Sequence, residues 1–139
     1  LGDYDGEIQD CSKAIELKAD HAKAYNNRGM AYSMKGECLR AIEDCNKSIE
    51  LMPNYAQAYN TRGTAYGQMG NHAQALADFN KAIELDPNYP QPYHGRATAL
   101  SSLGQYDKAW ADLKKFQQLG GTPSPQLVEN IMKATERRE

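Results

Sequence analysis

The sequence predicts an all-α fold, an α-solenoid in which antiparallel helix hairpins stack side by side. Three observations lead to this prediction: one repeat period along the chain, helical spacing of apolar residues in every unit, and glycine or proline at the joints between helices. The chain has 139 residues, of which 40% are hydrophobic and 24% charged, a composition typical of a folded protein. We expect a single domain over residues 1–139.

The composition also limits the classes of partner. The formal net charge of −2 argues against partners held by bulk positive charge, so we expect neither nucleic acid nor a membrane as partner. No apolar run approaches the roughly 18 residues that a membrane-spanning helix needs. The three cysteines are too few for a disulfide framework, which favours the cytoplasm without deciding the compartment. Histidines at 21, 72 and 94 are scattered, so no metal site is expected.

The repeat period is 34 residues. The series that follow it are the aspartates Asp10, Asp44, Asp78 and Asp112, the arginines Arg28, Arg62 and Arg96, and the glycines Gly2, Gly36, Gly70 and Gly104. Several series at one period indicate units that each form one supersecondary element. The predicted units are a half repeat with only a second helix at 1–21, whole repeats at 22–55, 56–89 and 90–121, and a capping helix at 124–138.

The first helix of a unit is predicted from one stripe of residues. Tyr25, Arg28, Gly29 and Tyr32 stand at i, i+3, i+4 and i+7, which is one face of a helix. Gly36 ends this helix, since glycine adopts the left-handed backbone at no steric cost. A glycine at position 29 costs about 1 kcal/mol relative to alanine. Because it recurs one period later, we expect two backbones to approach closely there.

The second helix follows from a similar pattern, which ends at a proline. Pro53 closes its unit because proline cannot continue the helical hydrogen-bond ladder. Trp110 stands at a position of this helix that is apolar in every unit, so we expect it in the core. The apolar residues at helical spacing in the first complete unit are Leu39, Ile42, Cys45 and Ile49.

The last helix is predicted to cover the end of the stack. Ser124 is the expected N-cap and Pro125 the first helical residue, a position that proline favours. Basic residues at 133, 137 and 138 suit the C-terminal end of a helix. Terminal repeats need a cap over their apolar surface. We expect Leu113 and Phe116 to be the contacts of this cap.

These units resemble the tetratricopeptide repeat, and Asn-Arg-Gly at 27–29 is similar to bacterial-type versions of it. The resemblance covers residues 1 to about 121. It implies a right-handed superhelix whose first helices line a concave groove. It also implies a protein–protein interaction scaffold that binds an extended peptide or a partner's helix in the groove, with no catalysis and no cofactor.

In the family the groove is lined by inward-facing positions of the first helices. The residues at such positions here are Lys23, Asn26, Asn27, Met30, Ser33, Asn60, Thr61, Thr64, Gln68, Gln91, His94 and Thr98. Almost all are uncharged, and amides both donate to and accept from a peptide main chain. The alternative interpretation is that these residues form only a solvated face.

One known mode of the family is a clamp in which Lys, Asn and Arg grip a C-terminal carboxylate. The corresponding residues are Asn26 and Met30, then Thr61, then Gln91 and Gly95. None of the three cationic positions is occupied, so the sequence argues against a carboxylate clamp in these repeats.

The arginine series has two interpretations. It forms structural ion pairs with the aspartates Asp10, Asp44, Asp78 and Asp112, or it binds phosphate of RNA or of a phosphopeptide. Equal registers along the array favour ion pairs. Each arginine has an aspartate 16 residues after it and another 18 before it, so the sequence leaves the choice of partner open.

Two other functions remain as alternatives. The half repeat leaves Ile8, Cys11 and Ile15 without a first helix to cover them, so a homo-oligomer formed through residues 4–17 is one alternative. A helical repeat that binds RNA is a minor one. No enzyme is expected, since no set of residues supplies a nucleophile, a base and an oxyanion site.

Overall fold

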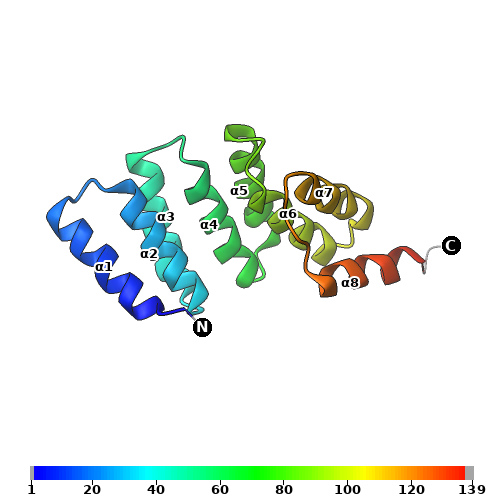
Figure 1. The fold of residues 1–139 in the computed structure, drawn as a ribbon, viewed down its shortest axis with the longest axis horizontal. Helices are drawn as coiled ribbons and strands as arrows, with labels where there is room; N and C mark the ends of the chain where they lie inside the picture. Colours follow the sequence, from blue (N-terminus) through cyan, green and yellow to red (C-terminus); the bar gives the residue numbers. More distant parts are fainter. Residues whose placement is uncertain (1, 137–139) are drawn as a thin grey trace.

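The computed structural model describes residues 2–136, and these fold into eight helices without a strand (Figure 1). The helices are α1 (Tyr4–Leu17), α2 (Ala22–Met34), α3 (Cys38–Leu51), α4 (Ala56–Gln68), α5 (His72–Leu85), α6 (Gln91–Ser102), α7 (Tyr106–Gln118) and α8 (Pro125–Glu136). The predicted helix at 124–138 runs past this range, and its last residues, with Arg137 and Arg138, lie outside the described residues.

The helices form an α-solenoid, which confirms the predicted fold class. From α1 to α7 each helix packs on the next along the chain, and the first helices α2, α4 and α6 also contact one another. Figure 1 shows the pairs advancing along one direction, with α1 and α8 at opposite ends of the stack. Within the described residues, no helix has the length and apolar character that crossing a bilayer requires.

Glycines end the first helices, as predicted. Gly36, Gly70 and Gly104 have φ values of +82°, +79° and +77°. The residue after each glycine donates its backbone N–H to a carbonyl of the last helical turn, as Glu37 does to Tyr32 at 2.9 Å. This left-handed cap uses carbonyls that a helix end leaves unpaired. The turn then directs the second helix back along the first.

The two helices of a hairpin approach most closely at the mid-helix glycine. A Cβ built on Gly29 would lie 3.1 Å from the carbonyl oxygen of Ala41, and one built on Gly63 would lie 3.1 Å from Asp78 Cβ. Ala97 occupies this register in the third complete repeat and is fully buried. The predicted close approach is therefore present.

Helix α8 caps the stack through a small apolar cluster. Leu127 and Ile131 of α8 are buried with Leu100 of α6 and Leu113 of α7. Leu113 is thus a contact of the cap, as expected. Phe116 does not belong to this cluster and stacks on His94 instead.

The expectation for Trp110 is wrong, because its side chain is exposed to 36%. Residues at the same repeat position are also not fully buried: Leu76, one period earlier, and Ile42, two periods earlier, are only half-buried.

Candidate functional site

A hollow of about 590 Å³ lies between α4 and α6, the first helices of two neighbouring repeats. Residues of these helices, of α5 and α7, and of the segment before α8 surround it. The lining comprises Asn60, Thr64, Gly67, Gln68, His72, Phe79, Gln91, His94, Gly95, Thr98, Ala99, Phe116, Thr122 and Ser124. Its volume falls in the usual range for ligand sites, about 300–1,000 Å³.

The apolar part of the hollow is formed by two phenylalanines. Phe79 lies on α5 and Phe116 on α7, and both residues are buried. Phe116 stacks on His94 with a centroid distance of 5.1 Å and an interplanar angle of 56°. A Cβ on Gly95 would lie 2.5 Å from Phe79 Cζ, so only glycine leaves room for this ring. The result is an aromatic wall made of Phe79, His94 and Phe116.

The hollow opens at one junction of first helices and not at the preceding one. Between α2 and α4, Thr61 donates a hydrogen bond of 2.8 Å to Asn26 Oδ1, and Ser33 donates one of 3.0 Å to Gln68 Oε1. Side chains thus fill that junction.

Between α4 and α6 the equivalent pairs each contain a glycine. The pair Asn60 and Gly95 stands one period after Asn26 and Thr61, and the pair Gly67 and Ser102 stands one period after Ser33 and Gln68. Asn60 donates its amide to the Tyr89 hydroxyl at 3.3 Å. Gly67 leaves its part of the junction open, whereas the Phe79 ring takes the place that a side chain at position 95 would occupy.

The polar part of the lining carries amides and hydroxyls. Thr64 and Thr98 donate to carbonyls of their own helix at 2.9 and 3.0 Å, so each keeps an acceptor lone pair for a ligand. Gln68 Oε1 already accepts from Ser33, which leaves its NH₂ group as the available donor. Gln91 is exposed at the rim.

None of the lining residues is an Asp, Glu, Lys or Arg. Burial lowers the pKa of the His94 imidazole below its usual value, so His94 is neutral at pH 7. The hollow therefore presents hydrogen-bonding groups and aromatic faces without a fixed charge. Within residues 2–136, no three side chains of His, Cys, Asp or Glu gather in a way that could hold a metal ion.

Half of the predicted groove residues lie together in this hollow, and half do not. Those that line it are Asn60, Thr64, Gln68, Gln91, His94 and Thr98. Lys23, Asn27 and Met30 are exposed on α2 but outside it.

Asn26, Ser33 and Thr61 are buried, with relative exposures of 0%, 3% and 6%. They hold α2 and α4 together through the hydrogen bonds between neighbouring repeats. In this structure their side chains are therefore closed to a ligand, which is a correction to the predicted groove.

Sequence analysis missed the residues that give the hollow its shape. Phe79 replaces the small Cys45 of the preceding repeat, and Phe116 replaces Ala82. Gly67 and Gly95 replace Ser33 and Thr61 in the same way. These departures from the repeat were visible in the sequence, and comparing residues 35 apart, across neighbouring repeats, would have found the glycines.

The three arginines of the repeat form ion pairs, each with the aspartate of its own hairpin. In each pair Nε and Nη2 donate to the two carboxylate oxygens at 2.7–2.9 Å. The pairs are Arg28–Asp44, Arg62–Asp78 and Arg96–Asp112. The hydrogen bonds to the carboxylates raise the pKa of each arginine.

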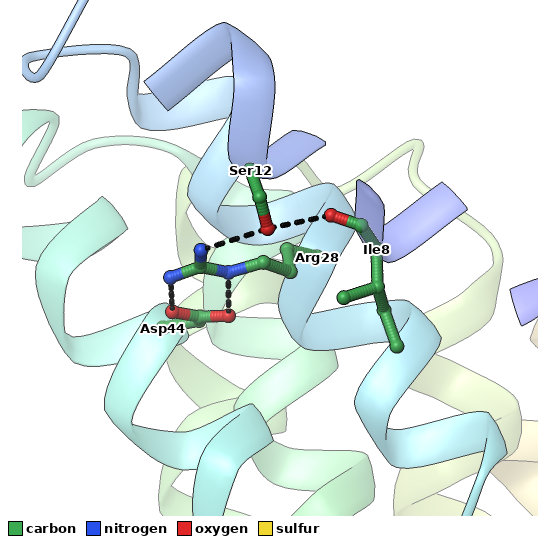
Figure 2. A network of polar contacts seen from close by, with 4 residues as sticks. All are labelled: Ile8, Ser12, Arg28 and Asp44. Atoms are coloured by element: carbon green, nitrogen blue, oxygen red, sulfur yellow. Dashed lines mark hydrogen bonds and ion pairs between the residues drawn. The ribbon is translucent and has the colours of Figure 1, made fainter. Parts of the chain in front are cut away.

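The third nitrogen of each guanidinium reaches the second helix of the preceding repeat. Figure 2 shows this for Arg28, whose Nη1 donates to Ser12, which in turn donates to the Ile8 carbonyl. One period later, Arg62 donates to Asn46 at 2.9 Å, and Arg96 donates to Asn80 at 3.0 Å. Each arginine thus joins one hairpin to its neighbour, a contact that sequence analysis did not anticipate.

Asp10 is the aspartate left over. It is exposed and makes no ion pair within residues 2–136, in contrast to its assignment to the structural pairs. The given sequence holds no position 16 residues before it. The arginines have their aspartates in their own second helices.

A family model of the tetratricopeptide repeat matches residues 22–55 and 56–89, and a second model of the same repeat matches residues 79–111. The chain belongs to the tetratricopeptide repeat family. No curated protein sequence matches it.

Solved structures agree with this assignment. Two structures of MamA are 30% identical, with TM-scores of 0.70 and 0.72, over 81% and 85% of this chain. The chain covers 66% and 64% of those MamA chains, about two thirds of their length.

Two other tetratricopeptide repeat proteins share the fold at lower identity. TTC0263, a thermophilic protein of Thermus thermophilus, is 21% identical with a TM-score of 0.82, over 97% of this chain and 74% of its own. The first such domain of Spaghetti (RPAP3), bound to the HSP90 peptide SRMEEVD, is 22% identical with a TM-score of 0.75, over 84% and 92% of the two chains. This tetratricopeptide repeat protein therefore shares its fold with these proteins.

Proposed function

We propose that this protein is a non-catalytic scaffold that binds an extended peptide segment of a partner protein in the hollow between α4 and α6. The observation that carries the proposal is the hollow itself, which combines an aromatic wall with amide and hydroxyl groups at its edge. Such groups can pair with peptide N–H and C=O groups, while the wall shields them from water. The RPAP3 domain, which has the same fold, is bound to a peptide.

The lining also distinguishes a peptide from RNA. A site that tracks a phosphate backbone needs positive charge, and the lining has none. A carboxylate clamp likewise needs cations, which supports the view that this hollow receives an internal segment of a chain and not its C-terminus.

The proposal is tested by selecting random peptides displayed on phage with the protein as bait, and by measuring the affinities of synthetic copies by calorimetry. Thr98 is exposed on α6 and lines the hollow, so Thr98→Trp should block it and weaken every selected peptide at least about tenfold. Met30 has the same register on α2 and lies outside this hollow, so Met30→Trp is the matched control. The proposal would be contradicted if the selected peptides bound Thr98→Trp with the same affinity as Met30→Trp and the unaltered protein.

A second candidate function is self-association through residues 4–17. The observation that favours it is the exposure of α1, which has no buried residue. Cys11 is partly exposed, whereas its counterparts Cys45, Phe79 and Leu113 are exposed by no more than 3%. A first helix covers those counterparts, and none covers Cys11 within the described residues.

Light scattering over a range of concentrations tests this second candidate. The mass should rise with concentration, and Leu17→Lys, at a residue that is 89% exposed, should keep the protein monomeric. Leu39→Lys, at a residue of α3 that is 68% exposed, is the control and should leave association unchanged. A monomer at all concentrations would exclude this function.

A further inference from the structure

We infer that the hollow between α4 and α6 selects its peptide by one aromatic side chain, which inserts against the wall of Phe79, His94 and Phe116. The inference rests on the proposed function and adds the chemistry of the anchor residue. It follows from the rings that form the wall, from the absence of charge in the lining, and from the placement of polar groups at the edge.

The wall is suited to a further ring. Aromatic rings prefer tilted or offset contacts at centroid distances of about 4.5–7 Å, and His94 and Phe116 already stand in such a contact at 5.1 Å. The Phe79 ring packs directly against Gly95 and forms the floor of the hollow. A fourth ring that enters beside these three gains edge and face contacts that a branched aliphatic side chain lacks.

The absence of charge in the lining disfavours a charged anchor residue. A lysine or arginine side chain, or a terminal carboxylate, would lose water in the hollow without finding a counter-charge in the lining. His94 is neutral at pH 7 and can donate or accept only one hydrogen bond at each ring nitrogen. An uncharged side chain avoids that loss.

The polar groups lie on both sides of the aromatic wall, where the peptide main chain next to the inserted residue would run. Gln91 and Thr98 lie on α6, and Asn60, Thr64 and Gln68 lie on α4 across the hollow. A peptide that inserts one ring can thus hydrogen-bond its flanking amides on both sides. The side chain supplies selectivity and the main chain supplies sequence-independent affinity.

The test uses small blocked amino acids as probes, with amide shifts followed by NMR on the whole chain. N-acetyl-phenylalaninamide should bind weakly, with a millimolar dissociation constant, and shift the amides of Gly95 and Thr98. It should bind about fivefold more tightly than N-acetyl-leucinamide. N-acetyl-lysinamide and N-acetyl-phenylalanine with a free carboxylate should not bind measurably. Equal or tighter binding of the leucine, lysine or carboxylate probe would overturn the inference.

Two variants test whether the preference for the phenylalanine probe depends on the aromatic wall. Thr98→Trp should abolish binding of N-acetyl-phenylalaninamide, and Met30→Trp should leave it unchanged. Phe116→Leu keeps an apolar side chain but removes a ring, so the ratio of phenylalanine to leucine probe affinity should fall from about five to near one. An unchanged ratio in that variant would contradict the aromatic wall even if both affinities fell.

The outcomes also separate this inference from the proposed function. If displayed peptides bind in the hollow but carry no aromatic residue, the scaffold function stands and the aromatic anchor is wrong. If no displayed peptide is blocked by Thr98→Trp, the proposed function itself is wrong.

Discussion

The guanidinium of Arg62 holds the carboxylate of Asp78 with two parallel hydrogen bonds, at 2.9 and 2.7 Å, while its third nitrogen binds Asn46 of the preceding repeat. The Asp78 side chain is 7% exposed and that of Arg62 22%. A charge held this far from water depends on its partner, and the geometry repeats at Arg28 and Arg96.

Loss of Arg62 should therefore destabilise the protein strongly. Arg62→Leu leaves the Asp78 carboxylate buried without a counter-charge, which should lower the free energy of unfolding by about 3 kcal/mol and the melting temperature by about 10 °C. The double variant Arg62→Leu/Asp78→Leu should lose much less than the two single variants together. Asp5→Ala breaks the exposed pair with Lys35 and should leave the melting temperature unchanged. Additive losses in the Arg62–Asp78 cycle would show that the pair is not coupled.

Two glycines of α4 should respond to alanine in opposite directions. A Cβ on Gly67 would meet only Ala75 Cβ, at 3.9 Å, so Gly67→Ala should gain helix propensity and stabilise the protein by up to about 1 kcal/mol. A Cβ on Gly63 would lie 2.9 Å from the Phe79 ring and 3.1 Å from Asp78 Cβ, so overpacking should outweigh the gain and lower stability by about 1 kcal/mol. Urea unfolding of both variants measures the difference, and shifts of the same sign would contradict the packing described for Gly63.

The stability of the protein should depend on the protonation of His94. Burial lowers the pKa of His94 in the folded state, so the unfolded chain takes up the proton first as the pH falls below about 6.5. The free energy of unfolding should fall between that pH and the folded-state pKa, and lose nothing more from this group below it. Melting temperatures from pH 7.5 to 5 should drop more for the unaltered protein than for His94→Gln. An NMR titration that places the His94 pKa at or above 6.5 would refute this.

Cys45 should be unreactive in the folded protein. Burial raises its pKa to about 12, so at pH 8 only about one thiol in 10,000 is ionised, and the side chain is fully buried. Cys11 and Cys38 are only half-buried. A maleimide should label Cys11 and Cys38 under native conditions and Cys45 only after unfolding, as mass spectrometry of the digested protein would show. Rapid native labelling of Cys45 would contradict the packing described for α3.

The repeat period was enough to predict the helices, the turn glycines and the type of partner for each arginine, because these depend on residues within one hairpin. It did not decide between the aspartate 16 residues after an arginine and the one 18 before it, since both spacings bring the residues to neighbouring helices. The structure selects the aspartate of the same hairpin at all three arginines.

The groove was predicted only in part, because the fate of a first-helix side chain depends on the next repeat. Asn26 and Asn60 are the same residue in the same register, yet Asn26 is buried under Thr61 while Asn60 lines the hollow beside Gly95. A pattern read one unit at a time assigns both to the groove. The aromatic wall was not predicted, because Phe79 and Phe116 lie on second helices and the family's groove positions lie on first helices.

The two junctions between neighbouring first helices differ at two pairs of positions, which are Asn26–Thr61 and Ser33–Gln68 in one and Asn60–Gly95 and Gly67–Ser102 in the other. A recess at one joint therefore depends on small residues of the first helices together with the rings of the second helices behind them. Because each joint has its own set of these residues, an array of this kind can acquire new ligands joint by joint.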